Sequence, residues 1–150
     1  MKNKIVRSAK HAMLLLMLLL IGYSCSDDPV QDFEKTEWNI ENFTVEAYEW
    51  NWNPSSLRWE AVRPLSFIDE FIYEKGAVIG YVFIAENGKE VQYQLPHTLN
   101  LRDGEFVYTQ TLDYNFDYKT KRATFLIKPS DSFEDLEAKK TYDFRIAMIW

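Results

Sequence analysis

The sequence predicts an all-β fold, an antiparallel two-sheet sandwich of about eight or nine strands over residues 38–150. Three observations favour this fold. Short runs of alternating apolar and polar residues are separated by turn-forming residues. No segment of this region keeps the apolar period of an amphipathic helix. Successive runs are joined by short connections, which favours antiparallel pairing of neighbouring strands.

The composition indicates one folded domain with an acidic surface. The chain has 150 residues, of which 47% are hydrophobic and 16% aromatic, so it can bury a core. Residues 1–24 contain four basic residues and no acidic one. The remaining chain therefore has thirteen basic and twenty-three acidic residues, a net charge of −10. Because such a surface repels phosphates, nucleic-acid binding is not expected.

The N-terminal 24 residues predict a signal peptide. A basic start is followed by ten uninterrupted apolar residues at 12–21, about half of the roughly 20 that a membrane span needs. Cleavage after Ser24 leaves Cys25, the only cysteine of the chain, at the new N-terminus. An ordinary secretory peptidase would leave it as a free thiol, and a lipoprotein peptidase would leave it acylated. A lone thiol is a liability in an oxidising compartment, which favours acylation of Cys25.

The stretch "IGYSCSDD" resembles the lipobox cysteine and the acidic export signal of surface lipoproteins of Bacteroidetes. It departs from the usual lipobox at Gly22, where leucine is common. Trp38 at the start of the first strand, "LPHT", "FLIKPSD" and the ending "YDFRIAMIW" are similar to small lipoproteins of that phylum. The resemblance implies a removed signal peptide (1–24), a lipidated tether (25–37) and a β-sandwich domain (38–150) attached to the outer membrane. It implies no catalytic residues.

The first predicted hairpin lies within "AYEWNWNPSSLRWEAV". A loop at residues 53–56 is rich in turn formers, so Trp52 is expected opposite Leu57. Alternation then gathers one apolar face: Tyr48, Trp50, Trp52, Leu57, Trp59 and Ala61. A bulge near residues 46–48 is expected, because the apolar residues before it have the opposite parity.

Further strands are predicted along the middle of the chain. Residues 67–73 form one strand, and residues 77–84 form a central strand covered on both faces, because both parities are apolar. Residues 91–95 form the next strand, which Pro96 ends. Residues 97–104 are expected to be a connection.

The C-terminal part predicts one long hairpin and one last strand. The hairpin turns near Lys119-Thr120, and Ser130 or Ser132 then caps a helical turn. The last strand carries one apolar face, which suggests a C-terminus docked in a sheet: Tyr142, Phe144, Ile146, Met148 and Trp150. A closed up-and-down barrel of the lipocalin type is the alternative to the sandwich.

One aromatic cluster is the candidate ligand site of the sequence: Tyr48, Trp50, Trp52 and Trp59. Such rings can form a flat platform for sugars, since they combine apolar area with polar groups. The same rings are also the only apolar cover that this hairpin offers to a core. Both interpretations stay open, and the core is favoured.

Catalytic and metal-binding chemistry finds little support in the sequence. His97 is the only histidine after residue 24. Nucleophilic catalysis needs a histidine base beside a nucleophile, and a histidine-rich metal site needs several histidines. Asp113, Asn115 and Asp117 imitate the start of an EF-hand loop. The chain has Tyr118 and Thr124 where that loop needs glycine and glutamate. No enzymatic activity, metal or cofactor is expected.

These observations predict an outer-membrane lipoprotein that faces the cell exterior and acts as a non-enzymatic binding module. Its partners would be the bilayer, through acylated Cys25, and either a glycan or an envelope protein. The alternative is a lipocalin-like carrier of a small apolar ligand.

Overall fold

The computed structural model describes residues 36–150, except for the side chains of Asp103 and Phe106. The predicted signal peptide, Cys25 and the tether as far as residue 35 lie outside the described residues. The elements are β1 (Trp38–Val45), η1 (Ala47–Glu49), β2 (Asn51–Asn53), β3 (Arg58–Pro64), α2 (Glu70–Lys75), β4 (Ala77–Glu86), β5 (Lys89–Gln94), β6 (His97–Asp103), β7 (Phe106–Asp117), β8 (Arg122–Pro129), η2 (Leu136–Ala138) and β9 (Tyr142–Ile149).

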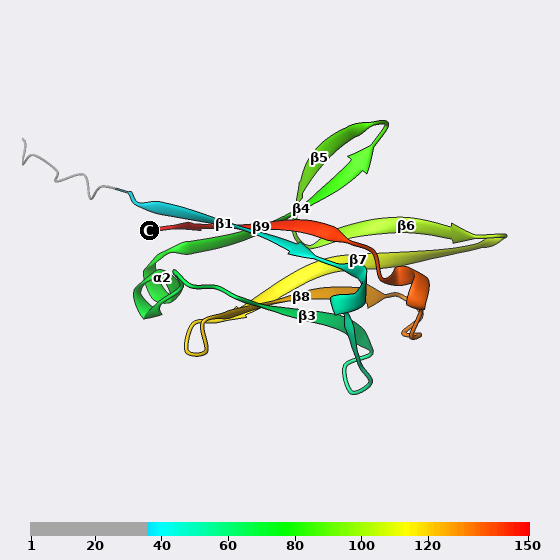
Figure 1. Ribbon diagram of the computed structural model, residues 1–150, viewed down its shortest axis with the longest axis horizontal. Helices are drawn as coiled ribbons and strands as arrows, with labels where there is room; N and C mark the ends of the chain where they lie inside the picture. The colour runs from blue at the N-terminus through cyan, green and yellow to red at the C-terminus, as the bar shows by residue number, and fades with distance from the viewer. Residues whose placement is uncertain (1–35) are drawn as a thin grey trace, which may run out of the picture. The chain divides into compact units, whose positions relative to one another are not determined.

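The described residues form a two-sheet antiparallel sandwich, as predicted (Figure 1). One sheet has the strand order β1-β9-β4-β5, and the other has the order β2-β3-β8-β7-β6. Both sheets stay open, with β1 and β5 at the edges of the first and β2 and β6 at the edges of the second. The alternative of a closed barrel is therefore wrong.

Aromatic rings fill the centre of the space between the sheets. Phe125 of β8 stacks on Phe144 of β9 with ring centroids 4.2 Å apart and planes at 14°. Phe43 of β1 lies 5.5 Å from Phe125 by the same measure. The predicted apolar face of the last strand is confirmed, since its residues in β9 are buried: Tyr142, Phe144, Ile146 and Met148. The C-terminus is docked, because Trp150 and Glu37 exchange backbone hydrogen bonds.

A glycine in β4 allows a strand of the opposite sheet to approach closely. A Cβ atom on Gly80 would lie 2.5 Å from Cε1 of Tyr114, well inside van der Waals contact. The hydroxyl of Tyr114 donates a hydrogen bond of 2.8 Å to the carbonyl oxygen of Val78. Gly80 is therefore needed where the ring of Tyr114 crosses from β7 to β4.

The strand expected at residues 67–73 is wrong, because α2 occupies most of it. Asp69 caps this helix, its Oδ1 accepting a hydrogen bond of 2.8 Å from the backbone N–H of Ile72. Ile68 and Ile72, four residues apart, are both buried. This helical spacing outweighs the strand preference of the aromatic residues around it.

The connection expected at residues 97–104 is also wrong, because β6 occupies residues 97–103. Its register with β7 pairs His97 with Leu112 and Leu99 with Gln110. Half-buried Leu99 and Leu101 alternate with exposed polar residues. The strand forms because this short alternation completes the sheet edge beside β7.

The first hairpin forms with the predicted faces in a shifted register. Trp52 pairs with Trp59 instead of Leu57, and the loop spans residues 54–57. Oδ1 of Asn53 accepts hydrogen bonds from the N–H groups of Ser55 and Ser56, which fixes the loop start. Because the shift is an even number of residues, Trp52, Trp59 and Ala61 keep the predicted face. Tyr48 and Leu57 do not join it, since Tyr48 lies exposed on η1 and Leu57 lies exposed in the loop.

The connecting segments differ in detail from the expectation. The 3-10 helix η1 replaces the bulge expected near residues 46–48 and carries the chain from one sheet to the other. The helical turn η2 is capped by Asp135, not by Ser130 or Ser132. The long hairpin of β7 and β8 is confirmed, and it turns at residues 118–121.

β4 is central in its sheet, between β9 and β5, as predicted. The expected cover on both faces is wrong. Gly80 and Val82 face the core, whereas Ile79, Tyr81 and Phe83 on the other face are only half-buried. The outer side of β4 is thus apolar and partly open to solvent.

Because Tyr142 is buried, the free energy of unfolding should fall at high pH. Burial raises the pKa of its hydroxyl from 10.0 to about 12. As the pH rises from the unfolded pKa of 10.0 to the folded pKa of about 12, the Tyr142 hydroxyl loses its proton in the unfolded chain first, so the free energy of unfolding falls. The contribution of Tyr142 to this loss is roughly 2 kcal/mol. Urea unfolding at successive pH values should show a shallower decline in Tyr142→Phe than in the wild type. Equal declines would contradict this cause.

Candidate functional site

The predicted aromatic cluster does not form one exposed platform. Trp50 and Trp59 are buried, with 2% and 3% of their surface exposed. Tyr48 lies on η1 and is 81% exposed, and Trp52 is half-buried on β2. Trp50 and Trp59 are therefore core residues, whereas Tyr48 and Trp52 keep accessible surface.

Trp50 and Trp59 differ in how their indole N–H groups are paired. Nε1 of Trp50 donates a hydrogen bond of 2.9 Å to the carbonyl oxygen of Lys140, which ties the β8–β9 connection to the core. Nε1 of Trp59 is buried without a hydrogen-bond partner in the described part of the chain. The ring of Trp59 lies 5.3 Å from that of Trp52, and Nζ of Lys139 lies 5.0 Å from the Trp59 ring.

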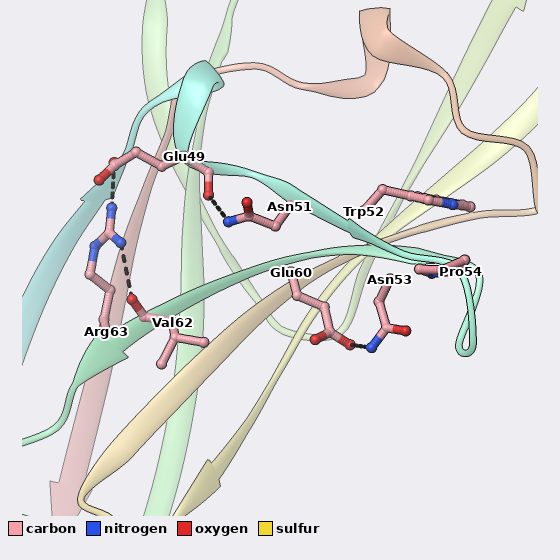
Figure 2. Close-up of a pocket in the computed structure, with 8 residues that line it drawn as sticks. All are labelled: Glu49, Asn51, Trp52, Asn53, Pro54, Glu60, Val62 and Arg63. Carbon is pink, nitrogen blue, oxygen red and sulfur yellow. Dashed lines mark hydrogen bonds and ion pairs between the residues drawn. The ribbon is translucent and has the colours of Figure 1, made fainter.

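A groove of about 570 Å³ opens on the outer side of the first hairpin, and we call it the β2–β3 groove (Figure 2). It is lined by Glu49, Asn51, Trp52, Asn53, Pro54, Glu60, Val62 and Arg63. The parity of β3 explains this position. Trp59 and Ala61 face the core, so Glu60 and Val62 face outward. In Figure 2 the indole of Trp52 extends away from Glu60.

Three donors converge on one carboxylate oxygen in the β2–β3 groove. Oε1 of Glu60 accepts hydrogen bonds from Arg58 at 2.7 Å, from Asn53 at 3.2 Å and from Ser56 at 3.2 Å. Partial burial alone raises the pKa of Glu60, but these hydrogen bonds outweigh burial, so the pKa lies below its ordinary value. Glu60 is therefore a fixed anion at neutral pH.

A second ion pair closes the other end of the groove. The guanidinium of Arg63 contacts the carboxylate of Glu49 and donates hydrogen bonds to the carbonyl oxygens of Thr44 and Val62, both at 3.1 Å. Nδ2 of Asn51 donates to the carbonyl oxygen of Glu49 at 2.9 Å. The charged groups are thus paired and held by the fold, which presents hydrogen-bonding atoms in fixed directions.

Sequence reasoning found part of this groove without recognising it as a site. The alternation that gathers the tryptophans on one face of the hairpin leaves Glu49, Asn51, Arg58 and Glu60 on the other, polar face. Sequence reasoning missed Val62 and Arg63, because the distance between η1 and the end of β3 depends on how the chain crosses between the sheets. The polar alternation opposite the tryptophans was the available signal.

His97, Asp113 and Asp117, which were also singled out in the sequence, have structural partners. The imidazole of His97 stacks on Tyr93, with ring centroids 4.1 Å apart. Asp113 pairs with Lys128 at 2.5 Å, and Asp117 accepts a hydrogen bond from the N–H of Lys119 in the turn. The aspartates share the outer face of β7.

Comparison with protein-family models, curated proteins and solved structures found no match to this chain. In residues 36–150, no helix combines the length and apolar character that crossing a membrane requires.

The unequal pairing of the two buried indoles gives a stability prediction. Trp50→Phe removes a hydrogen bond to Lys140, whereas Trp59→Phe removes a donor that has no partner. We expect Trp50→Phe to lower the free energy of unfolding by about 1 kcal/mol more than Trp59→Phe, measured by urea denaturation. A larger loss in Trp59→Phe would show that its N–H is satisfied in solution.

Proposed function

We propose that the mature protein is a lipoprotein of the outer membrane that faces the cell exterior and binds a neutral glycan in the β2–β3 groove, without turnover. The observation that carries the proposal is the groove itself. It places the amides of Asn51 and Asn53 and the carboxylate of Glu60 around an open surface beside Val62 and Pro54.

The chemistry of these side chains suits a sugar. A sugar ring presents hydroxyl groups that pair with amides and carboxylates, and C–H groups that pack on apolar side chains. Because Glu60 and Arg63 are already held by neighbouring groups, little side-chain freedom is lost on binding. The charges of the groove are paired, and the rest of the chain is acidic, so an uncharged ligand is favoured over an anionic one.

An envelope protein is the second candidate partner. Tyr48 and Leu57, which are 81% and 47% exposed, lie on the segments that carry the groove. Exposed aromatic and aliphatic residues beside fixed polar groups are typical of protein interfaces. A lipocalin-like carrier needs a closed barrel with an internal cavity. Here the sheets do not close, and Phe125 and Phe144 fill the space between them.

A glycan array with a blocking variant tests the binding proposal. Val62 is 49% exposed in the groove, so Val62→Arg should fill it and weaken binding at least ~10-fold. Asn115→Arg places the same side chain at an exposed position on the outer face of the same sheet, and it should bind like the wild type. Wild-type protein that is silent across neutral glycans would contradict the proposal. Equal loss in both variants would also contradict it, because it would remove the groove as the site.

Metabolic labelling with a fatty acid tests the anchor. The label should enter the wild-type protein and should be absent from Cys25→Ala, because the thiol of Cys25 is the proposed attachment point. Labelling that survives this substitution, or a wild type that stays unlabelled, would contradict the anchor. Ser55→Ala, in an exposed loop of the folded domain, is the control and should be labelled like the wild type.

A further inference from the structure

The outer face of the β1-β9-β4-β5 sheet is divided into an apolar half and a half that combines polar and aromatic residues. Two cross-strand rows form the apolar half: Trp38, Ile149 and Ala77 in the first, and Ile40, Ala147 and Ile79 in the second. We call these six residues the apolar half-face. Neighbours in such rows have Cβ atoms about 5 Å apart, so the six side chains form one continuous patch.

The apolar half-face is open to solvent. Trp38 is 68% exposed, Ile40 43% and Ile149 38%, although each has a β-branched or aromatic side chain suited to burial. A contiguous group of this kind on a small domain indicates a surface that is covered in the working protein.

The next two rows of the same sheet combine polar and aromatic residues: Asn42, Arg145 and Tyr81 in the third, and Thr44, Asp143 and Phe83 in the fourth. Nε of Arg145 donates a hydrogen bond of 2.8 Å to Asn42, and the guanidinium lies 4.9 Å from the ring of Phe83. The hydroxyl of Thr44 donates to Asp143 at 2.6 Å. Rows without a polar side chain are therefore confined to the end of the sheet where β1 begins and β9 ends.

The same end of the fold carries further aromatic residues. Phe71 and Tyr73 of α2 are 58% and 54% exposed, and the ring of Tyr73 stacks on Tyr118 at 4.6 Å. Gly76, which follows α2, lies directly against the backbone of Ile149. Figure 1 shows α2 beside the start of β1 and the C-terminus. Aromatic side chains with a polar group are favoured where a membrane meets water.

Basic residues accompany these aromatic residues. Lys75 ends α2, and Lys119 and Lys121 lie in the β7–β8 turn that packs on it. They offset part of the negative charge of this end, which comes from Glu37, Asp69, Glu70, Glu74 and Asp117. Long basic side chains can also extend their amines toward lipid headgroups.

The chain enters the fold at this end. Trp38 follows Cys25 by thirteen residues, so a fully extended tether reaches at most about 45 Å. An acylated Cys25 would hold the apolar half-face near one bilayer at all times. Even a weak contact is then well populated, because attachment makes it intramolecular.

We propose that the apolar half-face lies on the bilayer in which acylated Cys25 is inserted. This inference rests on the lipid anchor of the proposed function. It adds an orientation, because the β2–β3 groove opens on the outer face of the other sheet and is then directed away from the lipid. The tether and the half-face together fix which side of the domain a ligand can reach.

Tryptophan quenching by lipid tests the proposal on the mature acylated protein. The protein is placed in vesicles of phosphatidylethanolamine and phosphatidylglycerol, with or without bromine on the acyl chains. Bromine should quench part of the wild-type fluorescence, and that part should be lost in Trp38→Phe, which keeps an apolar ring. Trp52→Phe, changed on the hairpin of the other sheet, should keep the quenched part.

A matched pair of charge variants separates the two faces. Ile40→Glu should reduce quenching, whereas Val62→Glu, at a similarly exposed β-branched residue of the other sheet, should not. Circular dichroism checks that both variants are folded. Quenching that is absent from the acylated wild type, or equal in both variants, overturns the orientation and leaves the anchor intact. A dimeric wild type without quenching assigns the half-face to a second copy. Protein without acyl label overturns both proposals.

Discussion

The stacked rings of Phe125 and Phe144 join the two sheets at the centre of the molecule, and most other features depend on this contact. Offset stacking at 4.2 Å sets the distance between β8 and β9, and Phe43 and Trp50 pack around the same pair. A centre filled in this way leaves the outer surfaces as the places where a ligand can bind. The position of the groove on the outside of the sandwich thus follows from the filled core.

The packing at the centre also makes the two outer faces different. On one sheet, Trp59 is buried in the core and Glu60 faces outward, where it accepts hydrogen bonds from Arg58 and Asn53. On the other sheet, Met148 is buried in the core and Ile149 faces outward, where it lies between Trp38 and Ala77. A polar groove on one layer and an apolar half-face on the opposite layer fit a domain held between a membrane and a soluble ligand.

The parity of strands could be predicted from the sequence, because alternation follows directly from strand geometry. The buried face of β9 followed from this rule alone. The central place of β4 was predicted instead from apolar residues at both parities, although its outer side is only half-buried. The register of the first hairpin could not be predicted, since it depends on how Asn53 bonds the loop and on Leu57 adopting a positive φ of 51°. A one-turn helix cap at Asp69 likewise outweighed the strand preference of its neighbours.

The candidate site was less predictable than the fold. Tryptophans at 50, 52 and 59 stand out in a sequence, but two of them are needed to fill the core. The groove depends on Glu49 and Arg63, fourteen residues apart, meeting across the crossing between the sheets. Such a contact exists only after the sandwich has formed.

The central claim is that the domain has one face for the bilayer and the opposite face for a ligand. Hydroxyl-radical footprinting of the acylated protein on vesicles tests it most directly, because oxidation reports the exposure of individual side chains. Relative to the protein in detergent-free buffer with the acyl chains removed, vesicles should protect Trp38, Ile40 and Ile149. Val62 in the groove should react equally in both. Protection of Val62 with Trp38 unprotected would contradict the claim.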